Sequence, residues 1–252
     1  MSEPGQKTAL VTGAGRGIGR AVVDRLMADG YRVAGCGRST KPGDWPDAAL
    51  WVQADVGSSE DVTRLVTAVT EALGPIRVLV NNAGVQIERT VADTTDSEFD
   101  LLCGANMRGP FLMSRTVLPS MARTGGAIVN VGSISGHVAD PSMAIYNASK
   151  SFVHGLTRSI AVDHGPNVRC NAVCPGWVQT AMADEGFGMA RDPQAARADA
   201  LRRHPSGRLV MPEDVARTIS WLASDASAPI TGTCVTVDGG LTAASPLQPG
   251  LF

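Results

Sequence analysis

Apolar residues follow two patterns along the chain: short continuous runs, and longer segments in which they recur every three to four residues. The short runs are bounded by Gly, Asn, Asp or Pro and predict buried strands at 7–13, 31–36, 49–55, 76–84, 126–133, 167–176 and 233–240. The periodic segments predict amphipathic helices at 18–30, 58–74, 96–123, 142–164 and 211–224. This alternation predicts an α/β fold, with a doubly wound, seven-stranded parallel sheet covered by helices on both faces.

Two segments lie outside the alternation. Residues 181–204 are compatible with helix but rich in Gly, Met and Arg, which predicts an insertion that covers a substrate; an ordinary pair of surface helices is the alternative. The tail at 241–252 is interrupted by Pro and has no periodicity. No repeat, linker or low-complexity block divides the chain, so we predict a single domain over 1–252.

Composition and charge narrow the class of partner. Of 252 residues, 44% are apolar and 18% charged, which is typical of a globular protein, and the net charge is −2. Without a basic run longer than a pair, neither a nucleic acid nor an acidic membrane is expected as partner. The start "MSEPGQK" does not resemble a signal sequence, and no apolar stretch approaches about 18 residues. We therefore expect a cytoplasmic protein.

The cysteines are odd in number and form no C-x-x-C pair, which favours reduced, mostly buried thiols. They are Cys36, Cys103, Cys170, Cys174 and Cys234. Cys170 and Cys174 could serve as metal ligands, but no second cluster of Cys or His accompanies them in the sequence. Both are expected to be core residues, and no metal site is predicted.

A glycine-rich turn, "TGAGRGIG" at Thr12–Gly19, follows the first predicted strand and opens into a helix. Glycines at this spacing let the backbone turn sharply and approach a ligand, and the helix start offers free N–H groups to a phosphate. A tight strand-to-helix connection would use the same glycines. Its place after the first strand of an alternating chain favours nucleotide binding.

The stretch "YNASK" places Tyr146 four residues before Lys150, so on a helix both side chains share one face. An ammonium beside a phenol favours the phenolate and lowers the tyrosine pKa. Such a pair also arises by chance on many helices, so it does not identify an active site alone.

Taken together, these and four further motifs resemble the short-chain dehydrogenase/reductase family over about Lys7–Gly240. The family's motifs appear in its order as "TGAGRGIG", "NNAG" (Asn81–Gly84), Asn106 in "NMRG", Ser133, "YNASK" and "PGWVQT" (Pro175–Thr180). The resemblance implies a Rossmann fold with NAD(P) across the carboxyl ends of the strands. It also implies that Tyr146 and Lys150 form an active site.

By this resemblance, the coenzyme lies against residues from several strand ends. The implied coenzyme-binding residues are Gly13, Arg16, Gly17, Ile18, Gly19, Arg38, Asp55, Val56, Asn82, Ala83, Gly84, Tyr146, Lys150, Pro175, Gly176, Val178 and Thr180. Among them, Asp55 is expected at the adenine, Ile18 near the nicotinamide, and Val178 and Thr180 at its carboxamide.

The implied catalytic residues are Asn106, Ser133, Tyr146 and Lys150. Tyr146 exchanges a proton with the substrate oxygen, and Lys150 binds the nicotinamide ribose and lowers the tyrosine pKa. Ser133 positions the substrate oxygen, and Asn106 holds a water that links Lys150 to solvent.

Substrate contacts are expected from Ser133 and Ser135, from His137 at the mouth, and from Met182 and Phe187 in the insertion. Ser135 could instead be only a pocket wall. His154 is expected on the surface of its helix.

Coenzyme choice is predicted from the end of the second strand, where NAD-preferring folds carry an acidic residue for the ribose 2′-hydroxyl. Here Gly37 and Arg38 follow that strand, and Arg16 is a second cation within the phosphate loop. A guanidinium can bind a 2′-phosphate as a fork, which predicts NADP. The alternative is that both arginines are solvated and NAD is accepted equally.

The predicted function is hydride transfer between NADP(H) and a small carbonyl or secondary alcohol substrate. The predicted assembly is a homotetramer. A 3-oxoacyl-thioester reductase is the alternative within the enzyme class. A sensor or scaffold that binds NAD(P) without chemistry is disfavoured, because Asn106, Ser133, Tyr146 and Lys150 are all present.

Overall fold

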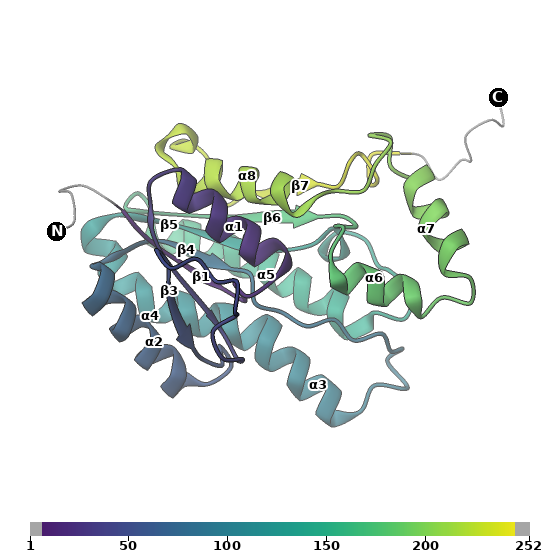
Figure 1. The fold of residues 1–252 in the computed structure, drawn as a ribbon, viewed down its shortest axis with the longest axis horizontal. Helices are drawn as coiled ribbons and strands as arrows, with labels where there is room; N and C mark the ends of the chain where they lie inside the picture. The colour runs from purple at the N-terminus through teal and green to yellow at the C-terminus, as the bar shows by residue number, and fades with distance from the viewer. Residues whose placement is uncertain (1–6, 245–252) are drawn as a thin grey trace.

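The computed structural model describes residues 7–244, apart from the side chain of Met182. Seven parallel strands form one sheet in the order β3-β2-β1-β4-β5-β6-β7 (Figure 1). The strands are β1 (Thr8–Thr12), β2 (Arg32–Gly37), β3 (Leu50–Gln53), β4 (Ile76–Asn81), β5 (Gly126–Val131), β6 (Val168–Pro175) and β7 (Cys234–Val237). The predicted doubly wound Rossmann fold is confirmed. All seven predicted strands are present. Six are shorter than predicted because their runs continue into loops, and β2 has the predicted length but begins one residue later.

Helices cover both faces of the sheet. They are α1 (Gly17–Ala28), α2 (Ser59–Leu73), α3 (Asp96–Cys103), α4 (Gly109–Thr124), α5 (Ala144–His164), α6 (Ala181–Gly188), α7 (Pro193–Arg202) and α8 (Pro212–Ala223). Successive strand residues point to opposite faces, so Ala9 and Val11 pack with α1 and α8, whereas Leu10 packs with α2, α4 and α5. Both faces of the central strands are therefore buried, which explains their continuous apolar runs.

The prediction of one continuous helix at 96–123 is wrong, because a π-helical turn at Gly104–Arg108 separates α3 from α4. In this turn the N–H of Gly109 donates to the carbonyl of Gly104, five residues earlier. Pro110 has no N–H and cannot bond the carbonyl of Asn106, as a regular helix would require. The turn therefore distorts the helix at Asn106.

The segment 181–204 forms two short helices, α6 and α7, at the right of Figure 1. Their apolar side chains gather in a small cluster of their own, made of Ala183, Phe187, Ala200 and Leu209 with Trp177 and Ala196 against it. The insertion is thus helical and packed, although its sequence is irregular.

Within the predicted tail, the described residues end at Ala244, and residues 245–252 lie outside them. Asp238 holds the start of this segment: its carboxylate accepts hydrogen bonds from the N–H groups of Gly240 and Thr242 at 2.9 and 2.8 Å. Over residues 7–244, none of the helices combines the length and apolar character needed to cross a membrane.

Candidate active site

A cavity of about 720 Å³ lies at the carboxyl ends of the strands, the edge where open parallel sheets bind ligands. Most of the predicted site residues line it: Gly13, Arg16, Gly17, Ile18, Arg38, Asp55, Val56, Asn82, Ala83, Gly84, Ser133, Ser135, Tyr146, Lys150, Pro175, Gly176, Val178 and Thr180. They come from the loops after six strands and from α1 and α5. The sheet therefore brings together residues that are far apart in the sequence.

The phosphate loop requires glycine for steric reasons. A Cβ on Gly13 would lie 2.8 Å from Cα of Ala83, and its φ is +62°. A Cβ on Gly19 would lie 2.2 Å from the carbonyl oxygen of Gly13. Gly19 is buried and does not line the cavity, so its part is close packing of the first turn of α1 against the loop, rather than ligand contact.

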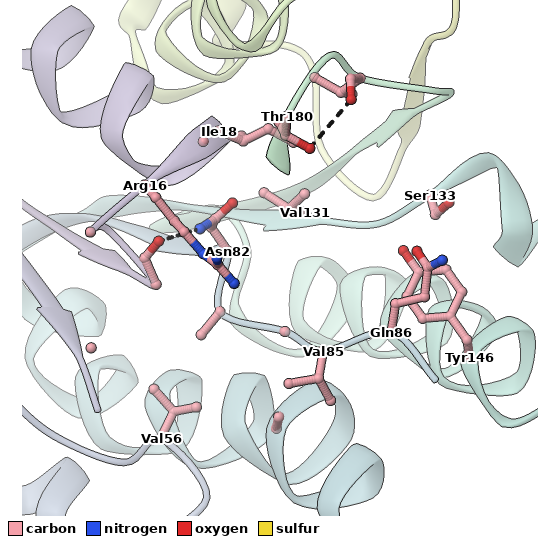
Figure 2. A pocket seen from close by; sticks show the side chains of 18 of the residues that line it. Arg16, Ile18, Val56, Asn82, Val85, Gln86, Val131, Ser133, Tyr146 and Thr180 are labelled. Carbon is pink, nitrogen blue, oxygen red and sulfur yellow. Dashed lines mark hydrogen bonds between the residues drawn. The ribbon is translucent and has the colours of Figure 1, made fainter. Parts of the chain in front are cut away.

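Hydrogen bonds tie the loop after β1 to the loop after β4. The amide nitrogen of Asn82 donates to the carbonyls of Thr12 and Gly13 at 2.9 and 3.0 Å. The hydroxyl of Thr12 accepts from the N–H groups of Asn82 and Ala83, both at 3.0 Å. Figure 2 shows Asn82 beside Arg16 and across the cavity from Val56. The side-chain amide of Asn82 thus fixes the loop after β4 to the phosphate loop.

The first turn of α1 is open to an anion. Its N-cap residue, Arg16, makes no capping hydrogen bond through its side chain, and the turn contains no acidic residue. By contrast, Ser58 accepts from the N–H of Asp61 at the start of α2. Uncapped N–H groups at a helix start favour a phosphate.

Two cations stand at this end of the cavity. Arg16 and Arg38 are exposed, and neither guanidinium forms an ion pair with a carboxylate among residues 7–244. Asp55 is also exposed, and its Oδ1 accepts from the N–H of Gly57 at 2.8 Å.

Trp51 is a lining residue that sequence reasoning missed. Its ring lies so close that a Cβ on Gly37 would be 3.1 Å from Cη2. The indole Nε1 is buried and has no hydrogen-bond partner in the described part of the chain. The sheet register pairs Trp51 with Gly35, three residues before Arg38, and no local sequence pattern marks that pairing.

Helix α5 presents Tyr146 and Lys150 on one face, as the spacing predicts. Nζ of Lys150 lies 5.5 Å from the centroid of the Tyr146 ring and donates to the carbonyl of Val131 at 2.9 Å. Lys150 is buried, and Tyr146 is half-buried at the cavity wall. In Figure 2, Ser133 and Gln86 flank the tyrosine.

Burial shifts the pKa values of both side chains. It raises the pKa of Tyr146 to about 12, and a hydrogen bond with Ser133 offsets only part of the increase. Burial also lowers the pKa of Lys150 to about 8. In the protein without coenzyme, burial is the largest cause of the shift in the tyrosine pKa. A lowering of that pKa by Lys150 together with the charge of a bound nicotinamide stays a prediction.

Asn106 lies buried in the π-helical turn and does not line the cavity. Its Oδ1 accepts from the N–H of Val85, and its Nδ2 donates to the carbonyl of the same residue, both at 2.8 Å. Nδ2 also lies 3.2 Å from Oγ of Ser149, beside Lys150 on α5. Its side chain joins the loop after β4 to the catalytic helix.

The serines form a chain that ends on an acidic group. Oγ of Ser133 donates to Oγ of Ser135 at 3.1 Å, and Ser135 donates to Oδ2 of Asp140 at 2.7 Å. Asp140 also lines the cavity, although no sequence motif marked it. Ser135 orients Ser133, which is more than a passive wall would do.

Two of the predicted substrate residues, Phe187 and His137, do not line the cavity. Phe187 is buried and stacks on Trp177, with ring centroids 5.0 Å apart, and does not line the cavity. His137 does not line it either. The side chain of Met182 lies outside what the structure describes. Trp177 and Gln86, which were not predicted, line the cavity in their place.

His154 is buried, so the prediction of a surface residue is wrong. Its Nε2 lies 3.1 Å from Sγ of Cys174, and its ring packs against the ring of His137, with centroids 4.4 Å apart. Burial lowers the pKa of His154 to about 4. Cys174 therefore has histidine neighbours that the sequence did not reveal.

Comparison with known proteins identifies relatives over nearly the whole chain. A family model described as enoyl-(acyl carrier protein) reductase matches residues 13–242. The chain is 35% identical to the NADP-dependent (R)-specific alcohol dehydrogenase of Lentilactobacillus kefiri, over 94% of this chain and 97% of that protein. It is 37% identical to the 3-oxoacyl-[acyl-carrier-protein] reductase MabA of Mycobacterium tuberculosis, over 93% and 92%. The ligand-free structure of the aldohexose dehydrogenase of Thermoplasma acidophilum superimposes with a TM-score of 0.91 at 32% identity, covering 96% of each chain.

Proposed function

The chain belongs to the short-chain dehydrogenase/reductase family and is a dehydrogenase acting on CH–OH groups, and from this premise we propose that it transfers a hydride between NADP(H) and a small carbonyl or secondary alcohol substrate. The observation that carries the proposal is the convergence of Ser133, Tyr146 and Lys150 on the cavity that begins at the phosphate loop.

The residues of the cavity fit a dinucleotide. Gly13 lets the phosphate loop approach the backbone of Ala83 closely, where a Cβ would clash, and the uncapped start of α1 offers N–H groups to a pyrophosphate. When bound, the nicotinamide coenzyme supplies the hydride. Tyr146 and Lys150 would then contact it at the nicotinamide end, with Val178 and Thr180 opposite.

Tyr146 handles the proton. A phenol whose pKa is held at about 12 is protonated at neutral pH and can donate to a substrate oxygen during reduction. Ser133, oriented by Ser135 and Asp140, holds that oxygen beside the phenol. In the reverse direction the tyrosine must first lose its proton, so we expect alcohol oxidation to accelerate with rising pH more than ketone reduction does.

Asn106 supports the relay from the π-helical turn. Pro110 has no N–H to donate to the carbonyl of Asn106, and we propose that this oxygen accepts a hydrogen bond from a water. The side chain of Asn106 is engaged with Val85 and Ser149. Such a water would connect Lys150 to solvent.

A panel of ketones and secondary alcohols, followed by the absorbance of the reduced nicotinamide, tests this function. Turnover of at least one simple ketone is expected. Coenzyme binding without turnover of any panel member would instead favour a sensor or scaffold.

A 3-oxoacyl-thioester reductase is the second candidate, favoured by the 37% identity to the mycobacterial reductase. Thioester substrates in the same panel separate the two. A kcat/KM more than about tenfold higher for a 3-oxoacyl thioester than for every simple ketone would select this candidate.

NADP is the proposed coenzyme, because two exposed cations lie at this end of the cavity. Arg16 precedes α1, and Arg38 follows β2. A charge-assisted hydrogen bond contributes roughly 1.5–3 kcal/mol, or about tenfold to over a hundredfold in affinity. Arg38→Asp should therefore weaken NADP binding by about that factor while changing NAD binding little. A higher kcat/KM with NADH than with NADPH in the unmodified enzyme would overturn the assignment.

We further propose a homotetramer located in the cytoplasm, with α4 and α5 at one interface. Exposed apolar residues on these helices, Phe111 at 45% and Val162 at 81%, support an interface there. Light scattering that gave the mass of one chain would reject the oligomer, and recovery with the membrane or medium fraction would reject the location.

A further inference from the structure

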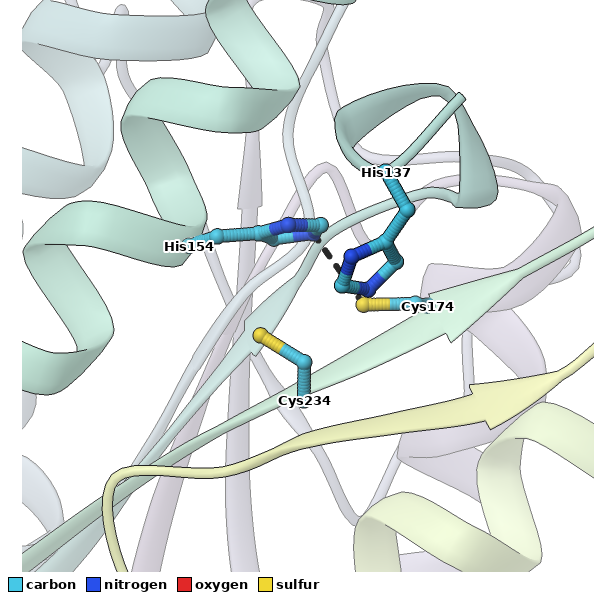
Figure 3. A group of neighbouring side chains, drawn as sticks. All are labelled: His137, His154, Cys174 and Cys234. Atoms are coloured by element: carbon cyan, nitrogen blue, oxygen red, sulfur yellow. Dashed lines mark hydrogen bonds between the residues drawn. The ribbon is translucent and has the colours of Figure 1, made fainter.

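Two histidines and two cysteines converge beside the last two strands, apart from the cavity. They are His137, His154, Cys174 and Cys234, and none of them lines the cavity as the described residues define it (Figure 3). They come from four segments: the end of the short turn after β5, helix α5, strand β6 and strand β7. His154 and Cys174 are buried, Cys234 is half-buried and His137 is exposed at the edge.

The spacing of the four ligand atoms is close to that of a tetrahedral metal site. The two sulfurs and two ring nitrogens all lie within 4.8 Å of one another, and Cys174 Sγ is 3.1 Å from His154 Nε2. With bonds of about 2.3 Å to sulfur and 2.0–2.1 Å to nitrogen, a tetrahedral zinc ion separates its ligand atoms by about 3.3–3.8 Å. Shifts of about 1 Å or less would complete the site, and the exposed ring of His137 has room to make them.

The surrounding backbone leaves space for the imidazole of His154. A Cβ on Gly132 would lie 2.7 Å from its Nε2, and one on Gly136 would lie 2.3 Å from its Cε1. Any larger residue at either position would push the ring away from Cys174. Both glycines lie in the turn that also carries Ser133 and leads to His137. This turn therefore leaves space for the imidazole of His154 and sets the position of His137.

We propose that His137, His154, Cys174 and Cys234 bind one structural zinc ion. Two thiolates and two neutral imidazoles form a donor set typical of closed structural zinc sites, in which no position is left for a substrate. The two thiolates balance the charge of the ion, so the bound site is neutral and its burial is not opposed by an uncompensated charge.

The position of this site gives the ion a mechanical role. His137 follows Ser133 by four residues, and His154 follows Lys150 by four residues on α5. An ion bound here would join the serine turn, the catalytic helix and the last two strands behind the cavity. Because only the folded chain assembles the four ligands, zinc should raise the unfolding temperature.

Metal analysis of a tag-free protein, purified with a thiol reductant and without chelator, tests the proposal. About one zinc per chain is expected, and cobalt substitution should give the visible absorption bands of tetrahedral cobalt bound to sulfur. His137→Ala and Cys234→Ser should each reduce the metal content to below about a tenth, while circular dichroism shows that the variants remain folded. His137 lies at the edge, so its removal leaves the core intact.

Cys103→Ser and His164→Ala are the matched controls, because neither residue belongs to the cluster. Both should retain the metal of the unmodified protein. Absence of zinc from the reduced protein even after addition of zinc, or full retention of zinc by both cluster variants, would overturn the proposal. So would mass spectrometry showing a Cys174–Cys234 disulfide in the reduced preparation.

Discussion

The two ends of the cavity are built from different materials. At the coenzyme end, the loops that form the wall are fixed to one another: Gly13 approaches Ala83 closely, and Asn82 uses its side chain to tie two loops together. At the substrate end, the wall is side chains, with Gln86 and Trp177 facing the same space. The coenzyme end cannot change shape without breaking hydrogen bonds to the sheet, whereas the substrate end can change by substitution alone.

Tyr146→Phe tests the point where the two ends meet and should have the largest effect. It removes only the oxygen that exchanges the proton, so turnover should fall by about 10²–10⁴-fold while coenzyme affinity is nearly unchanged. Steady-state kinetics and coenzyme titration measure the two quantities. If the variant kept more than about a tenth of the activity, Tyr146 would not be the acid–base group.

Gly19→Ala tests the rigidity of the coenzyme end. The added Cβ would meet the carbonyl of Gly13 at 2.2 Å, so the loop must move, at a cost of about 3 kcal/mol. We expect a more than about hundredfold loss of NADP affinity, measured by calorimetry. Gly43→Ala is the control, because a Cβ added at that position would have no neighbouring atom within 4 Å. Equal affinity in both variants would show that the loop is pliable.

Phe187→Ala tests the substrate end. The side chain supports Trp177 from behind in a separate cluster, so its loss should destabilise α6 and α7 by about 2–3 kcal/mol without lowering the stability of the sheet. Hydrogen exchange should accelerate over residues 181–202 only, and kcat/KM should fall more for bulky substrates. Met189→Ala, at a position that is 67% exposed, is the control.

The same exchange measurement tests whether this segment is a lid. In the unmodified protein, coenzyme and substrate together should increase protection across residues 181–202. Unchanged protection would refute the lid and leave an ordinary pair of surface helices.

Asp214→Asn should have the smallest effect, at the junction between α7 and α8. The carboxylate pairs with Arg208 at 2.6 Å and caps α8 through the N–H of Met211 at 2.9 Å. The Arg208 guanidinium is the largest cause that lowers the pKa of Asp214 from 3.8 to about 2. The lowered pKa contributes stability above about pH 4 that is lost as the pH falls towards 2.

Asp214→Asn should therefore cost about 1 kcal/mol at neutral pH and almost nothing near pH 2, measured by denaturant unfolding. A difference that persisted unchanged down to pH 2 would contradict this assignment.

The sequence predicted the coenzyme end far better than the substrate end. Strand periodicity and the glycines of the phosphate loop are local signals in the sequence. The residues that follow parallel strands then meet at one edge of the sheet. The break at Asn106 was missed because helical periodicity continues through it, although Pro110, four residues later, was a local sign. Phe187 and His154 were placed wrongly because their surroundings come from segments distant in the sequence, which no periodicity reveals.

The separate apolar cluster under α6 and α7 means that this pair of helices packs largely against itself. Its contacts are largely satisfied within residues 177–209, so a helix pair of different length or shape could replace it while β1, the phosphate loop and α5 stay as they are. Such a replacement would change the part of the cavity wall formed by Trp177, Ala181 and Ala183, while Tyr146 and Lys150 stay in place.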